Sequence, residues 1–149
     1  MVPNLDLLPA GVLVAACTWT DAKYRMIYNY VTYPAIITGL FLSLFNSRHE
    51  NIYGSIIIFF FYFLFFLGGK MGGGDLKLAV ALSLLLGMEP VLLGSILAGV
   101  VMMFWGFALT WYRTGRAENG LLVAIGKLPG GEMPYGALLG LLSLAVALL

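Results

Sequence analysis

The sequence has few charged residues and almost no cysteine or histidine. Only 10% of its 149 residues are Asp, Glu, Lys or Arg, whereas 61% are hydrophobic. Soluble domains carry roughly 25% charged residues, because they need a wetted surface. A chain with so little charge, and with a mean hydropathy of +0.96, must turn most of its surface to lipid. We therefore expect a single transmembrane domain, residues 1–149, with no separate soluble domain.

The scarcity of cysteine and histidine excludes several chemistries. Cys17 is the single cysteine, so a disulfide within the chain and a cysteine zinc site are both excluded. His49 is the single histidine, and the topology derived below places it on the outer side, which excludes catalytic triads that use histidine. The net charge is +1 and no basic stripe occurs, so we expect no nucleic-acid partner. We also expect no metal and no other cofactor.

Six apolar segments are candidates for membrane-spanning helices. A bilayer core about 30 Å thick takes roughly 20 apolar residues per helix, with shorter spans tolerated. Residues 1–16 contain no Lys or Arg, so the basic region of a signal peptide is missing and we expect the first segment to stay as a span. The fourth segment is short and is either extended at its ends or partly re-entrant. The candidate spans run about Leu5–Thr20, Val31–Asn46, Ile52–Gly69, Leu76–Gly87, Val91–Tyr112 and Met133–Leu149. This pattern predicts an all-α polytopic membrane helix bundle.

The basic residues predict the orientation of the bundle. If the six spans alternate, Arg48 falls on one side and the other seven Lys and Arg residues fall on the opposite side. Cytoplasmic loops carry an excess of Lys and Arg, so the side with seven is predicted to be cytoplasmic and both termini extracytoplasmic. The seven residues are Lys23, Arg25, Lys70, Lys77, Arg113, Arg116 and Lys127.

Asp21 and Asp75 differ from the other acidic residues. Each lies where a span meets the predicted cytoplasmic side, in apolar surroundings. An ionisable residue at such a depth is costly, and it marks a functional site or a partnered charge. The alternative is that both are helix-end charges, with Asp21 paired to Lys23 or Arg25 and Asp75 paired to Lys77. Asp75 also opens a helix, where the helix dipole stabilises a carboxylate.

A glycine-rich segment, Gly68–Gly74, directly precedes Asp75. Glycines permit unusual backbone angles and the close approach of another chain, which an extended peptide substrate beside a carboxylate requires. The segment is not a phosphate loop, because no Gly-Lys-Ser/Thr follows, and it lacks the strand that precedes a dinucleotide fingerprint. Gly72, Gly73, Gly74 and Lys77 are therefore candidate substrate-binding residues.

Three elements of the sequence resemble one known family. Gly72-Gly73-Gly74-Asp75 resembles the Gly-x-Gly-Asp motif of type IV prepilin peptidases and their archaeal preflagellin relatives. The segment that begins Thr20-Asp21 resembles the family's other aspartate motif, with Tyr28 at the position where a proline usually stands. Met133-Pro134-Tyr135-Gly136 resembles the Pro-Tyr/Phe-Gly element that opens the last helix of the family. The elements occur in the family's order and, with six spans, they cover nearly the whole chain.

The resemblance implies a membrane aspartyl endopeptidase in a prokaryotic cytoplasmic (inner) membrane, with Asp21 and Asp75 as its catalytic pair. Its substrates would be type IV pilin-like precursors, from which it would remove the short basic leader at the cytoplasmic face. Its other partner would be membrane lipid. Larger members carry an insert with paired Cys-x-x-Cys and methylate the new N-terminus. This chain has no such insert, so it resembles the short, peptidase-only forms of tight-adherence or Flp-type pili. The resemblance implies no metal or cofactor.

The expected mechanism uses two carboxylates that share one proton, because two neighbouring acids do not both ionise easily. The ionised member takes a proton from water, and the protonated member donates to the scissile carbonyl oxygen. Glu118 or Glu132, or anionic lipid, would help to hold the basic leader. Two functions of other classes remain open: a transporter or proton-relay subunit, whose acids usually lie near mid-membrane, and a scaffold of a pilus-assembly machine.

Overall fold

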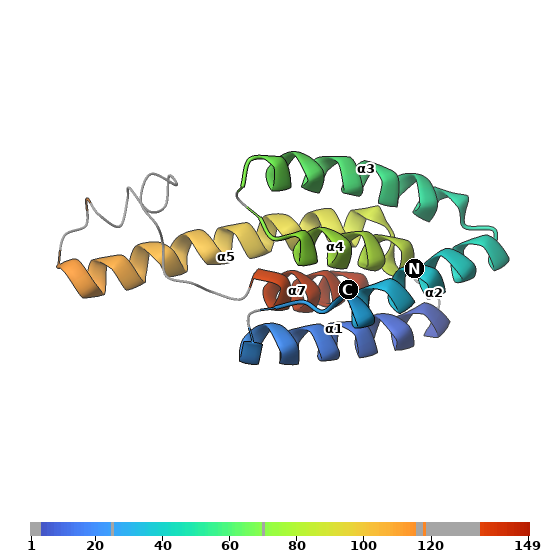
Figure 1. Ribbon diagram of the computed structural model, residues 1–149, viewed down its shortest axis with the longest axis horizontal. Helices are drawn as coiled ribbons and strands as arrows, with labels where there is room; N and C mark the ends of the chain where they lie inside the picture. Colours follow the sequence, from blue (N-terminus) through green and yellow to red (C-terminus); the bar gives the residue numbers. More distant parts are fainter. Residues whose placement is uncertain (1–3, 25, 70, 116–117, 119–134) are drawn as a thin grey trace.

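The computed structural model describes residues 4–24, 26–69, 71–115, 118 and 135–149. These residues contain helices and no strand, which confirms the predicted all-α class (Figure 1). Each helix overlaps one of the predicted spans, although the number of membrane crossings and the position of the termini stay predictions. The helices are α1 (Asn4–Tyr24), α2 (Asn29–Phe45), α3 (His49–Leu67), α4 (Gly73–Leu86), α5 (Met88–Thr114) and α7 (Tyr135–Leu148).

Helix α4 is the centre of the bundle. It is only 14 residues long, and it packs against α1, α2, α3, α5 and α7. Leu78, Ala79 and Leu84, which point to different faces of this helix, are all at most 4% exposed. The apolar side chains of α4 therefore pack against other helices. Near its C-terminal end the carbonyl of Leu84 accepts hydrogen bonds from Ser43 Oγ at 3.0 Å and Asn51 Nδ2 at 3.2 Å. The shortness of the fourth predicted span therefore reflects a core helix enclosed by the others.

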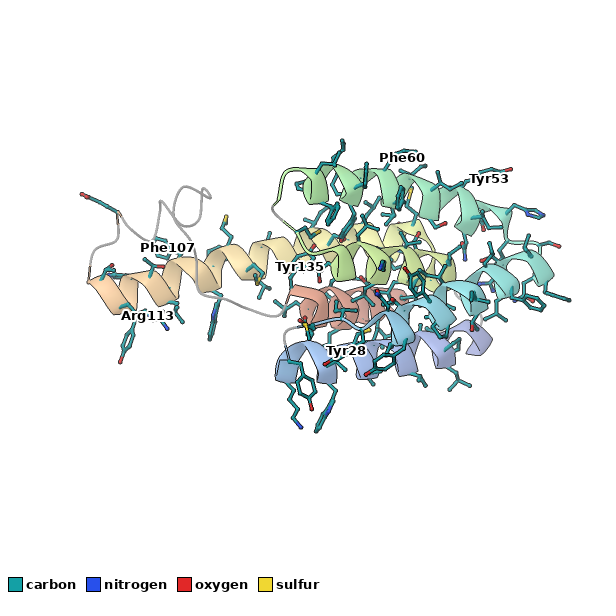
Figure 2. The ribbon with its side chains drawn as sticks, viewed as in Figure 1. Tyr28, Tyr53, Phe60, Phe107, Arg113 and Tyr135 are labelled. Atoms are coloured by element: carbon teal, nitrogen blue, oxygen red, sulfur yellow. The ribbon has the colours of Figure 1, made fainter. Side chains whose placement is uncertain are left out.

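Helices α3 and α5 carry the most apolar exposed surface. Both are long and apolar enough to cross a membrane by length and composition. Figure 1 shows α3 along one edge of the bundle and the C-terminal part of α5 extending beyond the other helices, and in Figure 2 Phe60 and Tyr53 point outward from α3. An apolar surface of this extent on a helix is typical of contact with lipid. Exposed side chains include Ile56, Phe60, Leu64 and Leu67 on α3 and Ile96, Val100 and Phe104 on α5.

Helices α5 and α7 approach each other closely at Gly94. A methyl group added at Gly94 would lie 2.7 Å from the backbone nitrogen of Ser143 and 2.8 Å from its Cα, and would also meet its Oγ. Helices in membranes associate through small residues that allow such close approach. Glycine is therefore required at position 94, because the atoms that a side chain would strike belong largely to the backbone of α7.

We expect Gly94→Ala to destabilise the bundle by about 1–3 kcal/mol, since the added methyl overpacks a backbone contact. The matched control is Gly99→Ala on the same helix, where an added methyl meets nothing within 4 Å. Thermal unfolding of the two purified variants in the same detergent measures the difference. Equal melting temperatures for the two variants would contradict the close packing of α5 on α7.

Candidate active site

Asp21 lies in the last turn of α1 and is buried, with 7% of its surface exposed. Its Oδ2 accepts a hydrogen bond from the backbone N–H of Ala137, in the first turn of α7, at 2.9 Å. Amides in the first turn of a helix have no partner within that helix, and the positive end of the helix dipole favours a carboxylate there. The end of α1 and the start of α7 are therefore joined through the side chain of Asp21.

Asp75 lies in the first turn of α4, just before the apolar stretch that begins at Leu76. Gly72, the residue that caps the helix, has an extended backbone with φ −76° and ψ 148°. Burial raises the pKa of the Asp75 carboxyl from 3.8 to about 6, and the charge of Asp21 contributes to the rise, against the lowering effect of a backbone hydrogen bond with Gly72. Near neutral pH, Asp75 is thus much closer to its protonated form than an exposed aspartate.

The two carboxyl groups meet over Gly136 of α7. A methyl group added at Gly136 would lie 2.9 Å from Asp75 Oδ1 and 3.1 Å from Asp21 Oδ2, and would also strike the side chain of Ile27. The two oxygens therefore cannot be further apart than the sum of these distances, about 6 Å. Within that separation one water molecule can hydrogen-bond to both, at about 2.5–3.0 Å from each.

Gly136 and Ala137 belong to the site, although the sequence alone did not assign them to it. The sequence indicated only that Pro134-Tyr135-Gly136 opens the last helix. Glycine at that position could have been read as a site of close approach between chains, but nothing in the sequence identified the neighbour. The structure shows that the neighbour is the pair of carboxyl groups, because α7 packs against both α1 and α4.

The glycine-rich segment is partly helical. Gly73 and Gly74 form the first turn of α4, so the unwound part is shorter than the sequence suggested. A methyl group added at Gly74 would lie 2.9 Å from Cβ of Ile27, which indicates that this glycine permits close packing against the residues before α2. Gly72 lies beside the Asp75 carboxyl, with an added methyl 3.4 Å from Oδ2. Their role in binding a substrate stays a prediction.

The two described lysines near the site, Lys23 and Lys77, contact groups other than the aspartates. Lys77 Nζ donates a hydrogen bond to Asn29 Oδ1 at 2.7 Å and lies 4.8 Å from the ring centre of Tyr33. It is therefore directed to α2, and it does not serve as the partner of Asp75. Lys23 is exposed and lies over the ring of Tyr24, while Arg25 falls outside the described residues.

Tyr28 occupies the position where the resemblance would place a proline. It precedes α2 with φ −81° and ψ 138°, and this φ is close to the value of about −65 ± 15° that a proline ring imposes. The backbone at this position is therefore nearly the same as a proline would give. The departure from the family's pattern leaves the path of the chain between α1 and α2 little changed.

Other parts of the described surface offer no rival site with comparable chemistry. A hollow of about 1200 Å³ lies at the opposite end of the bundle around Arg48, Glu50 and Glu89. Among the described residues, no three side chains of His, Cys, Asp or Glu lie together as a metal site requires. Glu118 is exposed, and Glu132 is outside the described residues.

The fold and the site define an all-helical protein with a strongly apolar surface, in which two carboxyl groups from different helices meet over a glycine. The chain belongs to the type IV leader peptidase family, whose sequence model matches residues 8–107. The match includes Asp21 and Asp75 and ends before α7. Comparison with curated proteins and with solved structures finds no match. Membership of this family makes the chain a membrane-associated protein of the peptidase class, and the family acts on pilin-like precursors.

Proposed function

We propose that this protein is an aspartyl endopeptidase that removes the short basic leader of type IV pilin-like precursors at the cytoplasmic face of the membrane. The observation that carries the proposal is the convergence of Asp21 and Asp75 on the same face of Gly136. Family membership supports leader cleavage in general. The paired carboxyl groups support water activated by two acids, which needs no covalent intermediate.

The surroundings of the two carboxyl groups favour different roles. The N–H of Ala137 donates to Asp21, and an ionised carboxylate is the better acceptor, so Asp21 suits the base that takes a proton from water. Asp75 is the member whose pKa burial raises to about 6, so it suits the acid that donates to the scissile carbonyl oxygen. In the attack step the proton lost by water goes to Asp21, and the carbonyl oxygen receives its proton from Asp75. When the resulting diol collapses and the C–N bond breaks, Asp21 gives its proton to the leaving amine and a diol hydroxyl returns a proton to Asp75.

The proposal extends to the placement in the membrane. We propose that residues 1–149 form one multi-pass domain in a prokaryotic cytoplasmic membrane, with the ends of α1, α4 and α7 that carry the site facing the cytoplasm. The excess of Lys and Arg on that side supports this orientation. The single cysteine supports the short, peptidase-only form, because the paired Cys-x-x-Cys insert of larger members has no counterpart here.

The experiment that tests the proposal is cleavage of a pilin-like precursor by membranes that contain the protein. The product is identified by mass and by its new N-terminus, which we expect at the junction between the basic leader and the hydrophobic helix. A precursor in which the residues at that junction are replaced is the matched control. Intact precursor after incubation with well-expressed protein would sink the proposal, as would cleavage at unrelated positions.

The rate of cleavage is expected to depend on pH. If Asp75 donates the proton, kcat/KM falls about tenfold per pH unit above the pKa of its carboxyl. Because kcat/KM reports the pKa of the free enzyme, that falling limb should begin near pH 6. The limb in kcat should lie at higher pH, because a bound precursor excludes water and raises the pKa of the Asp75 carboxyl. Initial rates of the detergent-solubilised enzyme over a pH series measure the limb. A rate that does not decline on the alkaline side would contradict the role of Asp75 as acid.

A further inference from the structure

Three hydroxyl groups form a cluster beside Asp75 that the proposed mechanism does not use. The cluster consists of Tyr62 of α3, Ser95 of α5 and Tyr135 of α7. Tyr62 Oη lies 2.5 Å from Ser95 Oγ and 3.3 Å from Tyr135 Oη. The Asp75 carboxyl is close enough to interact electrostatically with both tyrosine hydroxyls. Tyr62 is 1% exposed, so its hydroxyl depends on partners within the protein.

A single carbonyl group sets the direction of the hydrogen bonds in this cluster. Ser95 Oγ donates to the carbonyl oxygen of Val91 at 2.5 Å, and a hydroxyl has one proton to give. Since the Ser95 proton is committed to Val91, Tyr62 is the donor to Ser95. The Tyr135 proton is then the most weakly held of the three, because 3.3 Å to Tyr62 Oη is long for two hydroxyl oxygens and the interaction of Tyr135 with Ser95 is weaker than that with Tyr62.

Tyr135 belongs to the turn that already contacts both carboxyl groups. It directly precedes Gly136, over which the carboxyl groups meet, and Ala137, whose N–H donates to Asp21. Figure 2 shows Tyr135 at the start of α7, within the bundle. Its ring packs against the hydrophobic core, so the hydroxyl is held near the site by contacts that do not involve the hydroxyl itself.

The titratable groups around Asp75 come from several helices. Asp21 of α1, Tyr62 of α3 and Tyr135 of α7 interact with it electrostatically. On α4 itself, Lys77 is directed to Asn29 of α2, and α5 contributes Ser95 to the hydroxyl cluster. Of the described groups that interact with Asp75, the two tyrosines are therefore the neutral hydrogen-bond donors, and Tyr135 is the one with a proton to offer.

We propose that Tyr135 is a positioning residue of the site, whose hydroxyl turns from Tyr62 and donates a hydrogen bond to the Asp75 carboxylate when Asp75 has given up its proton. This inference rests on the proposed function, because it requires Asp75 to act as the acid. Tyr135 keeps its own proton throughout, and the proton on the carbonyl oxygen comes from Asp75. The change of acceptor from Tyr62 to Asp75 is favourable at that step, because a hydrogen bond to a carboxylate is stronger than one between two hydroxyls.

The test is Tyr135→Phe, in which the ring is retained and only the hydroxyl is lost. We expect kcat for precursor cleavage to fall on the order of tenfold or more, with KM nearly unchanged, since the hydrogen bond forms in the chemical step. The alkaline limb of the pH–rate profile should move to higher pH, because the ionised form of Asp75 loses a stabilising donor. A residue that only supports packing would not move this limb.

A second variant, Tyr62→Phe, gives an effect of opposite sign. It removes Tyr62 Oη, the stronger of the two acceptors that compete for the Tyr135 proton. The hydrogen bond to Asp75 then becomes more favourable, and the alkaline limb should move to lower pH. The control is Tyr53→Phe, also on α3, whose side chain is exposed and points outward (Figure 2). Tyr53→Phe should change neither the rate of cleavage nor the pH at which the alkaline limb begins.

The outcomes separate this inference from the proposed function. Wild-type protein that does not cleave the precursor would overturn the proposed function and the inference with it. Wild-type cleavage that is unchanged in rate and pH profile by Tyr135→Phe would overturn the inference alone. A lower rate with an unmoved limb, or limbs that move upward in both tyrosine variants, would assign the effect to a weakened α3–α7 contact and would also overturn it.

Discussion

Cleavage of a pilin-like precursor is expected to disappear when either Asp21 or Asp75 is replaced by Asn. General acid–base catalysis contributes roughly 10²–10⁴-fold to a rate, and in a pair that shares its work neither partner acts alone. Asn has nearly the same shape as Asp, and at position 21 its amide oxygen still accepts the hydrogen bond from Ala137. The variants therefore remove the proton chemistry while leaving the contacts of the bundle in place.

The measurement compares membranes that contain wild type, Asp21→Asn or Asp75→Asn at matched expression. Glu89→Gln is the matched control, because Glu89 is an exposed acid at the opposite end of the bundle, beside the large hollow. We expect it to cleave at the wild-type rate. Precursor that is cut equally well by both aspartate variants would remove the catalytic assignment and would favour a scaffold or a transporter.

Gly136→Ala is the second substitution with a large expected effect. Its methyl group would lie 2.9 Å from Asp75 Oδ1 and 3.1 Å from Asp21 Oδ2, closer than a carbon and an oxygen normally approach. The carboxyl groups must then move, and the face of Gly136 over which they meet is filled. A displacement of about 1 Å in a catalytic group can cost 10²-fold in rate, so we expect a loss of at least that order.

The control for Gly136→Ala is Gly11→Ala on α1, where an added methyl meets nothing within 4 Å. Both variants are assayed for precursor cleavage and for thermal unfolding in the same detergent. The expected pattern for Gly136→Ala is lost activity with a smaller change in melting temperature, because side-chain ends yield more easily than backbone. Full activity in this variant would contradict the closeness of the two carboxyl groups to Gly136.

Asp21 and Asp75 could be identified as candidates from the sequence, because each lies at the end of a predicted span and has apolar neighbours along the chain. Asp21 and Asp75 are polar residues in apolar surroundings, and charged groups are too costly there to occur without a reason. The sequence left open the alternative that the aspartates are helix-end charges, with Asp21 paired to Lys23 or Arg25 and Asp75 paired to Lys77. The structure removes the pairing of Asp75 with Lys77, since Lys77 reaches across to Asn29. Sequence proximity did not predict that contact, because the side chain of Lys77 projects toward α2.

The hydroxyl cluster shows why the rest of the site could not be predicted. Tyr62, Ser95 and Tyr135 are separated by 33 and 40 positions along the chain, and each by itself is an ordinary residue of an apolar helix. In α3, Tyr62 stands within a run of phenylalanines, and nothing in that pattern distinguishes its hydroxyl. Its partners become evident only when α3, α5 and α7 are packed together.

The amino-acid sequence by itself determined the helical class, the apolar surface and the approximate bounds of six helices, and it indicated the two aspartates that we propose as the catalytic pair. These properties depend on composition and on short-range pattern, which act on each segment separately. The tertiary structure alone decided that α4 is enclosed by the other helices and that the first turn of α7 contacts both Asp21 and Asp75, with Gly136 as the residue over which they meet. Such contacts depend on which helix faces pack together, and that choice is made by the whole bundle at once.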